Sequence, residues 1–497
     1  MAHVRTRFAP SPTGSLHIGG IRTALYAYAM AKKHGGEFVL RIEDTDRNRY
    51  VKGAEEEIFA VLEAYGLIPD ESTNHEGKFG PYRQSDRKEV YLKYARKLVE
   101  NGHAYYSFET KEDLDQIRKR AMENNERVVY RSSYRDLPLE KALAKVEAGE
   151  EYVIRQKMPE GEEVTYVDPL QGKMAFKTDE VDEGVLLKSD GLPTYHLAVV
   201  VDDHLMQITH AFRGVEWISS LPKHILLYKA FGWEMPQYVH LSLILDPGGG
   251  KLSKRKGTVA AGTFLEEGYL PEAMLNFLML LGWSSPEERK HGEQERELFS
   301  LDEFVEMFSI DGLNKSSPTF DREKLLWFNS NYLQKADTKK LAEAFISWLE
   351  RYANDPELLK LIEEKDTDFL ERILVLEQQR VKLLSELPGA IMLFYGRPEK
   401  VSLDKVKRLK KLPPEMGDKI FTEFLGKLAA HESFTDWDQE NWEQDVRSIA
   451  DGLKLKAGEV FMTLRIGVTS SDVSPPLYET MEILGKEEVT ERLKRYL

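Results

Sequence analysis

The stretch RFAPSPTGSLHIGG, residues 7–20, constrains the fold more than any other part of the chain. It begins inside a short strand-like run, Val4–Phe8, and continues through a proline- and glycine-rich turn. A helical pattern then starts near His17. This layout suits an anion such as phosphate, because backbone N–H groups and the positive helix end meet at the turn, and Gly19 and Gly20 allow close approach. A structural histidine at a helix start is the alternative for His17.

Composition sets the broad class of the protein. A chain of 497 residues has room for roughly three to five domains. Its 41% hydrophobic and 31% charged residues are typical of a globular protein. The sequence has no cysteine, which excludes disulfides and cysteine-ligated metal sites and fits the cytoplasmic location that we expect. Since no apolar run approaches the ~20 residues of a membrane span, and the chain starts directly with a strand pattern, we expect neither a membrane segment nor a signal peptide.

The net charge of −15 argues only weakly against a nucleic-acid partner, because binding depends on where the cations lie. Three clusters of Lys and Arg stand out, and a solvated loop or helix face is the ordinary explanation of each. They are Arg118–Arg120, Lys251 with Lys254–Lys256, and Lys405, Lys407, Arg408, Lys410 and Lys411.

The first hundred residues predict alternating strands and helices. After the first helix, Glu37–Asp44 is a mostly apolar run that ends in acids, as a buried parallel strand does when it delivers polar groups to a cleft. Lys52–Gly66 and Arg87–Asn101 both have the periodicity of amphipathic helices. This β-α-β-α order predicts a doubly wound α/β unit.

The pattern then changes twice. From Tyr105 to Lys188, charged helical segments alternate with short strand-like pieces, which predicts an α+β insertion between two halves of the sheet. Beyond Gly262 helical periodicity dominates, so the C-terminal third is predicted to be all-helical. Between these parts the sheet resumes; the predicted elements are strands at Pro193–Asp203, Gln207–Arg213 and Val239–Leu245, a helix through Ile225–Leu227, and a loop at Pro247–Gly250.

A second motif, KLSKR at residues 251–255, follows the last predicted strand and the glycine-rich loop. A reaction that displaces pyrophosphate from ATP builds negative charge on the β- and γ-phosphates. Cations on a loop that can close would stabilise that charge mainly in the transition state. Alone this motif is better explained by an exposed basic turn, but its combination with the strand-turn-helix element is far more specific.

The two motifs together resemble the two signatures of class I aminoacyl-tRNA synthetases. Nearly the whole chain is similar to the glutamyl/glutaminyl branch of that family, and most of all to bacterial-type glutamyl-tRNA synthetases. A helical tail distinguishes it from glutaminyl-tRNA synthetases, which carry β-barrel anticodon domains, and from a shortened paralogue that lacks such a tail. The stretches that carry the resemblance are residues 9–14, 40–46, 80–85, 189–196, 201–204 and 320–321.

The resemblance implies activation of L-glutamate by Mg-ATP to glutamyl-adenylate, followed by transfer to the 3′ terminal adenosine of tRNA-Glu. Whether tRNA-Gln is a second substrate stays open. We expect a monomer that needs tRNA for the first step. Two alternatives are a small-molecule nucleotidylyltransferase, which would not need the long helical tail, and a non-catalytic tRNA-binding or regulatory descendant, which would not need the site residues.

The resemblance also implies a division of the chain into six parts. They are a Rossmann-like first half (1–104), an acceptor-end-binding insertion (105–188), a Rossmann-like second half with the Lys-x-Ser-Lys loop (189–258), a helical stem-contact domain (259–325) and two anticodon-binding helical subdomains (326–390 and 391–497).

Roles carried over from the family place Arg7 and Arg213 around the substrate side-chain carboxylate, with Tyr195 nearby. An arginine fork matches a planar carboxylate and would leave the amide of glutamine poorly paired. Glu43 would take the α-ammonium group. Open alternatives are a structural ion pair of Arg213 with Asp202 or Asp203, and a capping role for Glu43. The remaining implied contacts are Ala9, Ser11 and Val199 for glutamate, Pro10, Ser11, His17, Gly19, Gly20 and Lys254 for ATP, and His17, Lys251, Ser253 and Lys254 for catalysis.

Several positions depart from family patterns. Gly20 stands where this branch often has His, and Val199 where some relatives have Asn. Tyr105, Ser107 and Tyr134 occupy the region where some members bind zinc through cysteines. We therefore predict no bound zinc and apolar or aromatic packing there. In the tail, Arg380 and Arg465 are candidate anticodon contacts, with a solvated or ion-paired arginine as the alternative for each.

Overall fold

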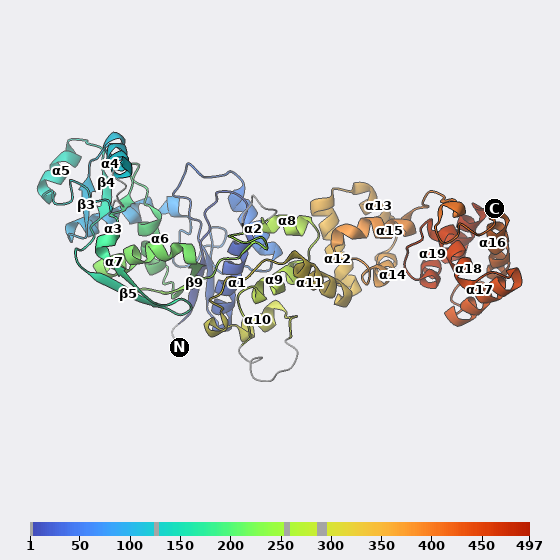
Figure 1. Ribbon diagram of the computed structural model, residues 1–497. Coiled ribbons are helices and arrows are strands. Elements are labelled where there is room, and N and C mark those ends of the chain that lie inside the picture. The colour runs from blue at the N-terminus through green and yellow to red at the C-terminus, as the bar shows by residue number, and fades with distance from the viewer. Residues whose placement is uncertain (1–2, 124–128, 253–258, 286–295) are drawn as a thin grey trace. The chain divides into compact units, whose positions relative to one another are not determined.

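The protein is described here from a computed structural model that places residues 3–123, 129–252, 259–285 and 296–497 (Figure 1). It divides into two compact units. Unit 1 comprises residues 1–264 and 271–322, and unit 2 comprises residues 265–270 and 323–497. Among the residues placed, no helix is long and apolar enough to span a membrane.

A four-stranded parallel sheet of order β2-β1-β8-β9 organises unit 1. The predicted first strand, turn and helix are confirmed as β1 and α1, and the helix begins directly after His17. The elements around the sheet are β1 (Arg5–Phe8), α1 (Ile18–Lys33), β2 (Glu37–Leu40), α2 (Ala54–Ala64), α3 (Lys88–Glu100), α6 (Tyr195–Leu205), β8 (His210–Gly214), α7 (Leu221–Phe231), β9 (Gln237–Leu241), α8 (Ala261–Glu266), α9 (Pro271–Leu280) and α10 (Leu301–Met307).

The prediction of a strand at Pro193–Asp203 is wrong, because Tyr195–Leu205 forms helix α6. Every residue from Leu197 to Asp203 is buried. A helix that is covered on all sides has no polar face, so its sequence is a continuous apolar run that periodicity cannot distinguish from a buried strand. The strand predicted at Gln207–Arg213 is confirmed as β8, shifted slightly toward the C-terminus.

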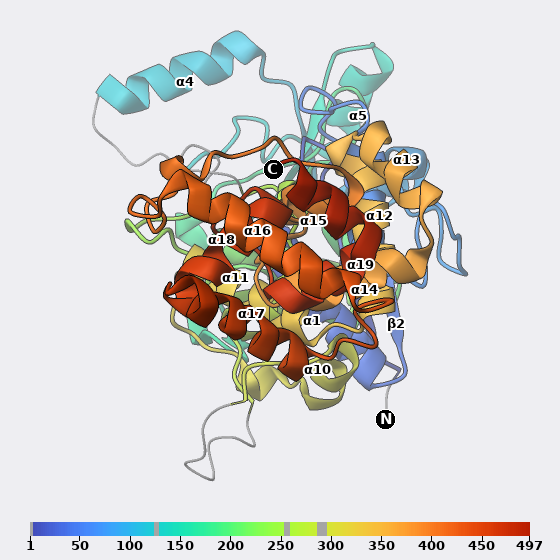
Figure 2. The ribbon, with the colours of Figure 1, turned by 90° about the vertical axis from the view of Figure 1, so that its right-hand side faces the viewer.

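The insertion contains a three-stranded antiparallel sheet, β3-β4-β7, and a separate hairpin, β5-β6. Figure 2 shows helix α4 extending away from the rest of unit 1. The predicted mixture of helices and short strands is therefore confirmed. Its elements are β3 (Ala104–Ser107), α4 (Lys111–Glu123), α5 (Leu139–Glu147), β4 (Val153–Gln156), β5 (Glu163–Asp168), β6 (Gly172–Lys177) and β7 (Val185–Leu187).

The predicted apolar packing at Tyr105 and Ser107 is wrong. Tyr105 donates a hydrogen bond to the fully buried carboxylate of Glu183 at 2.6 Å, and Arg135 donates to the same carboxylate at 2.8 Å. Ser107 Oγ accepts from a buried arginine, Arg155, at 3.0 Å. A buried carboxylate must be paired and hydrogen-bonded, so this region is built around a polar network. Aromatic packing holds only for Tyr134, whose ring centroid lies 5.3 Å from that of Phe108.

Unit 2 is all-helical throughout the residues placed, as predicted. The last four helices enclose a core that includes Phe421, Phe424, Trp437 and Trp442, and they lie together in Figure 2. The helices are α11 (Arg322–Lys335, of which Arg322 belongs to unit 1), α12 (Thr338–Trp348), α13 (Pro356–Glu364), α14 (Thr367–Glu377), α15 (Leu387–Tyr395), α16 (Pro414–Ala429), α17 (Gln439–Leu453), α18 (Ala457–Thr469) and α19 (Leu477–Lys494).

Gly36 fixes how β2 lies against β1, because a Cβ atom there would lie 1.8 Å from the carbonyl oxygen of Val4. We predict that Gly36→Ala lowers the free energy of unfolding of unit 1 by about 2–3 kcal/mol, since the backbone must shift. Gly262→Ala is the matched control, because its Cβ would meet only Val61 at an ordinary 3.7 Å. Thermal and urea unfolding of both variants would test this, and equal stability of the two would contradict it.

Candidate active site at the sheet switch point

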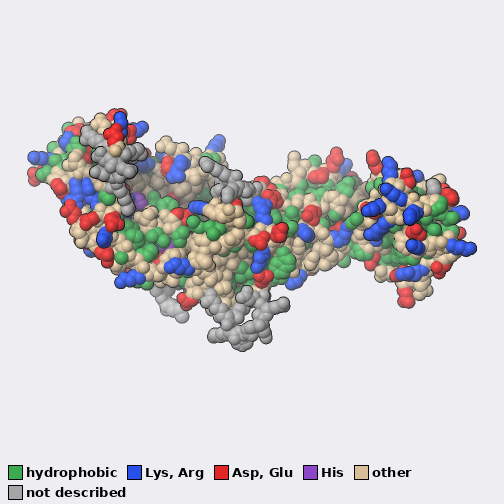
Figure 3. Space-filling view, viewed as in Figure 1, with side chains coloured by type: hydrophobic (Ala, Val, Ile, Leu, Met, Phe, Trp, Pro, Cys, Tyr) green, Lys and Arg blue, Asp and Glu red, His purple; other side chains and the backbone are tan. Residues whose placement is uncertain are grey.

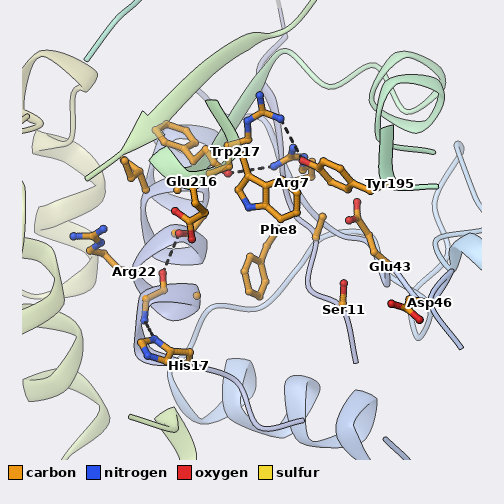
Figure 4. Close-up of a pocket in the computed structure, with 18 of the residues that line it drawn as sticks. Arg7, Phe8, Ser11, His17, Arg22, Glu43, Asp46, Tyr195, Glu216 and Trp217 are labelled. Atoms are coloured by element: carbon orange, nitrogen blue, oxygen red, sulfur yellow. Dashed lines mark hydrogen bonds between the residues drawn. The ribbon is translucent and has the colours of Figure 1, made fainter. Parts of the chain in front are cut away.

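Strands β1 and β8 are neighbours in the sheet, yet the chain continues from them to opposite sides: β2 lies beyond β1, and β9 lies beyond β8. Ligands of open α/β sheets bind at such a switch point, in the crevice outside the carboxyl ends of the strands. Here a cavity of about 800 Å³ opens beside Arg7 and Phe8 at the end of β1 and Arg213 and Gly214 at the end of β8 (Figure 4).

The structure brings most of the predicted site residues to this cavity, but not all of them. Val199 belongs to α6, where its side chain is fully buried in the core, and Pro10 does not line the cavity. Ser253 and Lys254 lie outside the described residues. The predicted residues that line it are Arg7, Ala9, Ser11, His17, Gly19, Gly20, Glu43, Tyr195, Arg213 and Lys251.

His17 caps the N-terminus of α1, and this fixes its tautomer. Its Nδ1 accepts a hydrogen bond from the backbone N–H of Gly19 at 2.9 Å. A neutral imidazole whose Nδ1 is an acceptor carries its proton on Nε2. The capping alternative considered from the sequence is thus realised, and the same bond sets Nε2 as a donor at a helix N-terminus that lines the cavity.

A network of buried ion pairs lies next to the cavity. Arg41 is fully buried and donates to Asp203 at 2.8 Å and to Glu43 at 3.0 Å. Arg7 lies against the same Asp203, with Nε 3.3 Å from Oδ1. Arg87 donates to the neighbouring Asp202 at 2.8 Å. Three arginines and three carboxylates are therefore interleaved at the ends of β1, β2 and α6.

Burial and charge act in opposite directions on these carboxyl groups. Burial raises the pKa of Glu43, and Arg41 and Arg7 only partly oppose it. Burial would also raise the pKa of Asp203, but the positive charges of Arg7 and Arg41 lower it below its ordinary value. Asp203 is thus the anchoring anion of the network, and Glu43 is the carboxylate at its edge that reaches the cavity.

Arg213 is not paired with Asp202 or Asp203, contrary to the structural alternative considered from the sequence. Its Nε donates to His240 at 2.9 Å, and its Nη1 lies 3.2 Å from both Tyr195 Oη and His224 Nδ1. Its Nη2 is buried and has no hydrogen-bond partner among the residues that the structure describes. The guanidinium also stacks on Tyr238, with Cζ 4.2 Å from the ring centroid.

Several residues at the site were not singled out from the sequence. Arg41 follows β2 two residues before Glu43, and the acid pair Asp202–Asp203 ends an apolar run, so both left a sequence signal. Trp217 left none; its ring lies 4.3 Å from that of Tyr195 at the cavity wall. Lys251, in contrast, was predicted from the sequence; it is exposed and pairs with Glu216 at 3.2 Å.

The lining is suited to an amino acid and a polyanion together. Arg213 and Arg7 supply cations at one end, and the N-terminus of α1 supplies amide donors at the other. Among the placed residues, no group of three or more His, Cys, Asp or Glu side chains is arranged to hold a metal ion.

Comparison with known proteins decides the family. Residues 3–327 match the class I tRNA synthetase catalytic domain (E and Q), and residues 340–497 match an anticodon binding domain. The chain belongs to this family. The resemblance and the fold class predicted from the sequence are thereby confirmed.

The relatives are similar over their full length. Glutamate–tRNA ligases from Prosthecochloris aestuarii and Christiangramia forsetii are 39% and 41% identical to this chain; each alignment covers 99% of it and 97% and 98%, respectively, of the relative. A crystal structure of a glutamate tRNA ligase from Elizabethkingia meningosepticum, in complex with its amino acid, superposes with a TM-score of 0.85 at 37% identity and 99% coverage of both chains.

Arg41 is the residue on which the buried network depends most. We predict that Arg41→Met costs about 3–5 kcal/mol of unfolding free energy, because Asp203 and Glu43 each lose a buried partner. Arg49→Met is the control, since Arg49 is exposed and its one ion pair with a described residue is a surface pair with Asp46, so it should change stability by less than about 0.5 kcal/mol. Urea titration would compare them; similar midpoints would show that the buried pairs contribute little.

Proposed function

We propose that this protein is a glutamate–tRNA ligase. It activates L-glutamate with ATP and transfers the glutamyl group to the 3′ terminal adenosine of tRNA-Glu. The observation that carries this proposal is the buried, unpartnered Nη2 of Arg213 at the switch point of a chain that belongs to this synthetase family. A buried donor without an acceptor is costly, and a substrate carboxylate would satisfy it.

Different residues of the cavity bind the two charged ends of the glutamate molecule. Arg213 takes the side-chain carboxylate, with Arg7 and the Tyr195 hydroxyl beside it. Glu43 takes the α-ammonium group, and the charge of that group favours the ionised carboxylate that burial disfavours. Glutamine would present an N–H₂ to Arg213, which has only donors, so glutamate is preferred.

ATP with Mg²⁺ lies toward the N-terminus of α1. The backbone N–H groups there and His17 Nε2–H donate to the phosphates, and Lys251, which also lines the cavity, adds positive charge. The α-carboxylate of glutamate attacks the α-phosphorus in line and pyrophosphate leaves. The terminal tRNA adenosine then attacks the activated carbonyl. No side chain forms a covalent bond, so catalysis consists of positioning and charge stabilisation.

We propose that the insertion (105–188) holds the acceptor end of the tRNA, residues 259–325 its stem, and residues 326–497 its anticodon. Figure 3 shows Lys and Arg gathered on the C-terminal part, and all five basic residues from Lys405 to Lys411 are exposed. In unit 2, Arg380 lines a cavity of about 600 Å³, where it pairs with Glu377, whereas Arg465 donates to Ser474 and Pro475. We further propose a cytoplasmic monomer.

Aminoacylation of purified tRNA-Glu and tRNA-Gln, with glutamate, ATP and Mg²⁺, tests the proposal. We expect tRNA-Glu to be charged, and Arg213→Met to lower kcat/KM for glutamate by at least about 100-fold because the carboxylate loses its charged partner. Charging of tRNA-Gln as well would define a non-discriminating enzyme. If folded protein binds tRNA but charges neither, it is a non-catalytic tRNA-binding descendant.

A pair of His17 variants separates capping from phosphate binding. His17→Ala should lower the unfolding free energy by about 0.5–2 kcal/mol through loss of the cap, whereas His17→Asn should retain it, because Asn is a preferred N-cap. Both lose the Nε2 donor, so both should lower kcat by about 10²–10³-fold. Recovery of activity by His17→Asn would show that capping is the whole role of this residue.

A further inference from the structure

The Arg213 guanidinium fixes the protonation of the two histidines that hold it. Nε of Arg213 lies 2.9 Å from His240 Nε2, and Nη1 lies 3.2 Å from His224 Nδ1. A guanidinium only donates hydrogen bonds. Both of these imidazole nitrogens must therefore be acceptors, so His240 carries its proton on Nδ1 and His224 carries its proton on Nε2.

The His240 proton is itself held in place. Nδ1 of His240 lies 2.7 Å from Asp168 Oδ2, and the other oxygen of Asp168 accepts the backbone N–H groups of Leu170 and Gln171 at 2.8 Å each. Asp168 is the last residue of β5, Leu170 and Gln171 form the turn that follows it, and His240 belongs to β9. A carboxylate anchored by a turn thus orients an imidazole, and the imidazole orients Arg213.

His224, the second of these histidines, is likewise oriented by a further hydrogen bond. Nε2 of His224 lies 3.2 Å from His196 Nδ1, which must accept, so His196 carries its proton on Nε2. Burial lowers the pKa of His224 well below its ordinary value and that of His196 to about 4, so both are neutral near pH 7. The charge of Arg213 is therefore bonded only to neutral groups among its described partners, whereas the charge of Arg7 is shared with Asp203.

We propose that His224 and His240 are positioning residues for the substrate carboxylate. They occupy Nη1 and Nε of Arg213 with neutral acceptors, which fixes the guanidinium plane and leaves Nη2, with an undivided positive charge, for the ligand. Neither histidine lines the cavity, so they act through Arg213. This inference rests on the proposed function, which assigns the side-chain carboxylate of glutamate to Arg213.

A crossed set of amide variants tests the assignment of acceptors. The side-chain oxygen of Asn lies near the position of a histidine Nδ1, and that of Gln lies near the position of Nε2. His224→Asn and His240→Gln therefore keep an acceptor facing Arg213, whereas His224→Gln and His240→Asn move it away. We expect KM for glutamate to rise about 10-fold or more in the second pair and less than about threefold in the first, as expected for one hydrogen bond to a charged group. KM for ATP should stay within twofold throughout.

The reversal of order between the two positions is the decisive result. If the histidines had a purely structural role, the effect of Asn and Gln on KM for glutamate would follow their size, in the same order at both positions. That outcome would overturn the inference, and so would four unchanged KM values. Thermal unfolding identifies the folded variants. If the His240 pair does not fold, the His224 pair decides alone, because there the proposal favours Asn although Gln is closer to His in size. Wild-type protein that charges no tRNA with glutamate would overturn the proposed function as well, whereas an active wild type without the reversal overturns this inference alone.

Discussion

Keeping Asp203 ionised in the interior is the constraint on which the catalytic unit depends. Burial alone would raise the pKa of this carboxyl group. The positive charges of Arg7 on β1 and of Arg41, the residue directly after β2, instead hold that pKa below its ordinary value. A buried carboxylate is tolerated only with such partners. Helix α6 is therefore tied to the two strands by charge as well as by apolar packing, and Arg7 also lines the cavity.

Two of the arginines that line the cavity, Arg7 and Arg213, have different environments. Arg7 shares its charge with Asp203, whereas Arg213 is held by a tyrosine and two neutral histidines. A cation that is already paired with a fixed anion attracts an anionic ligand less strongly than a cation that has only neutral partners. The reason is that the fixed anion cancels part of the positive potential at the ligand. Arg7 therefore mainly holds the sheet and α6 together, and in the proposed function Arg213 mainly contacts the substrate. Their burial is nearly equal, so partner chemistry alone separates the roles.

Local pattern was enough to predict β1, the turn and α1, because their signals are turn residues, glycines and a helix start within twenty residues. It failed at α6, since a helix covered on every side carries no periodicity. The partners of Asp203 were also missed: the only partner considered for it from the sequence was Arg213, as an alternative to substrate binding, and the fold pairs it with Arg7 and Arg41. Such choices depend on which strands become neighbours, as does the polar network around Glu183 that replaced the expected apolar packing.

The pairing of β1 with β8 has a consequence for how the chain folds during synthesis. Thr6 lies opposite His210, so β1 can pair with β8 only after a further 204 residues have been synthesised. At about 5–20 residues per second, a ribosome takes about 10–40 s to supply it. During that interval β1 can pair only with β2, and its other edge is open to other chains. Arg5 and Arg7 alternate along this strand and put charges where an apolar edge would be most prone to aggregate.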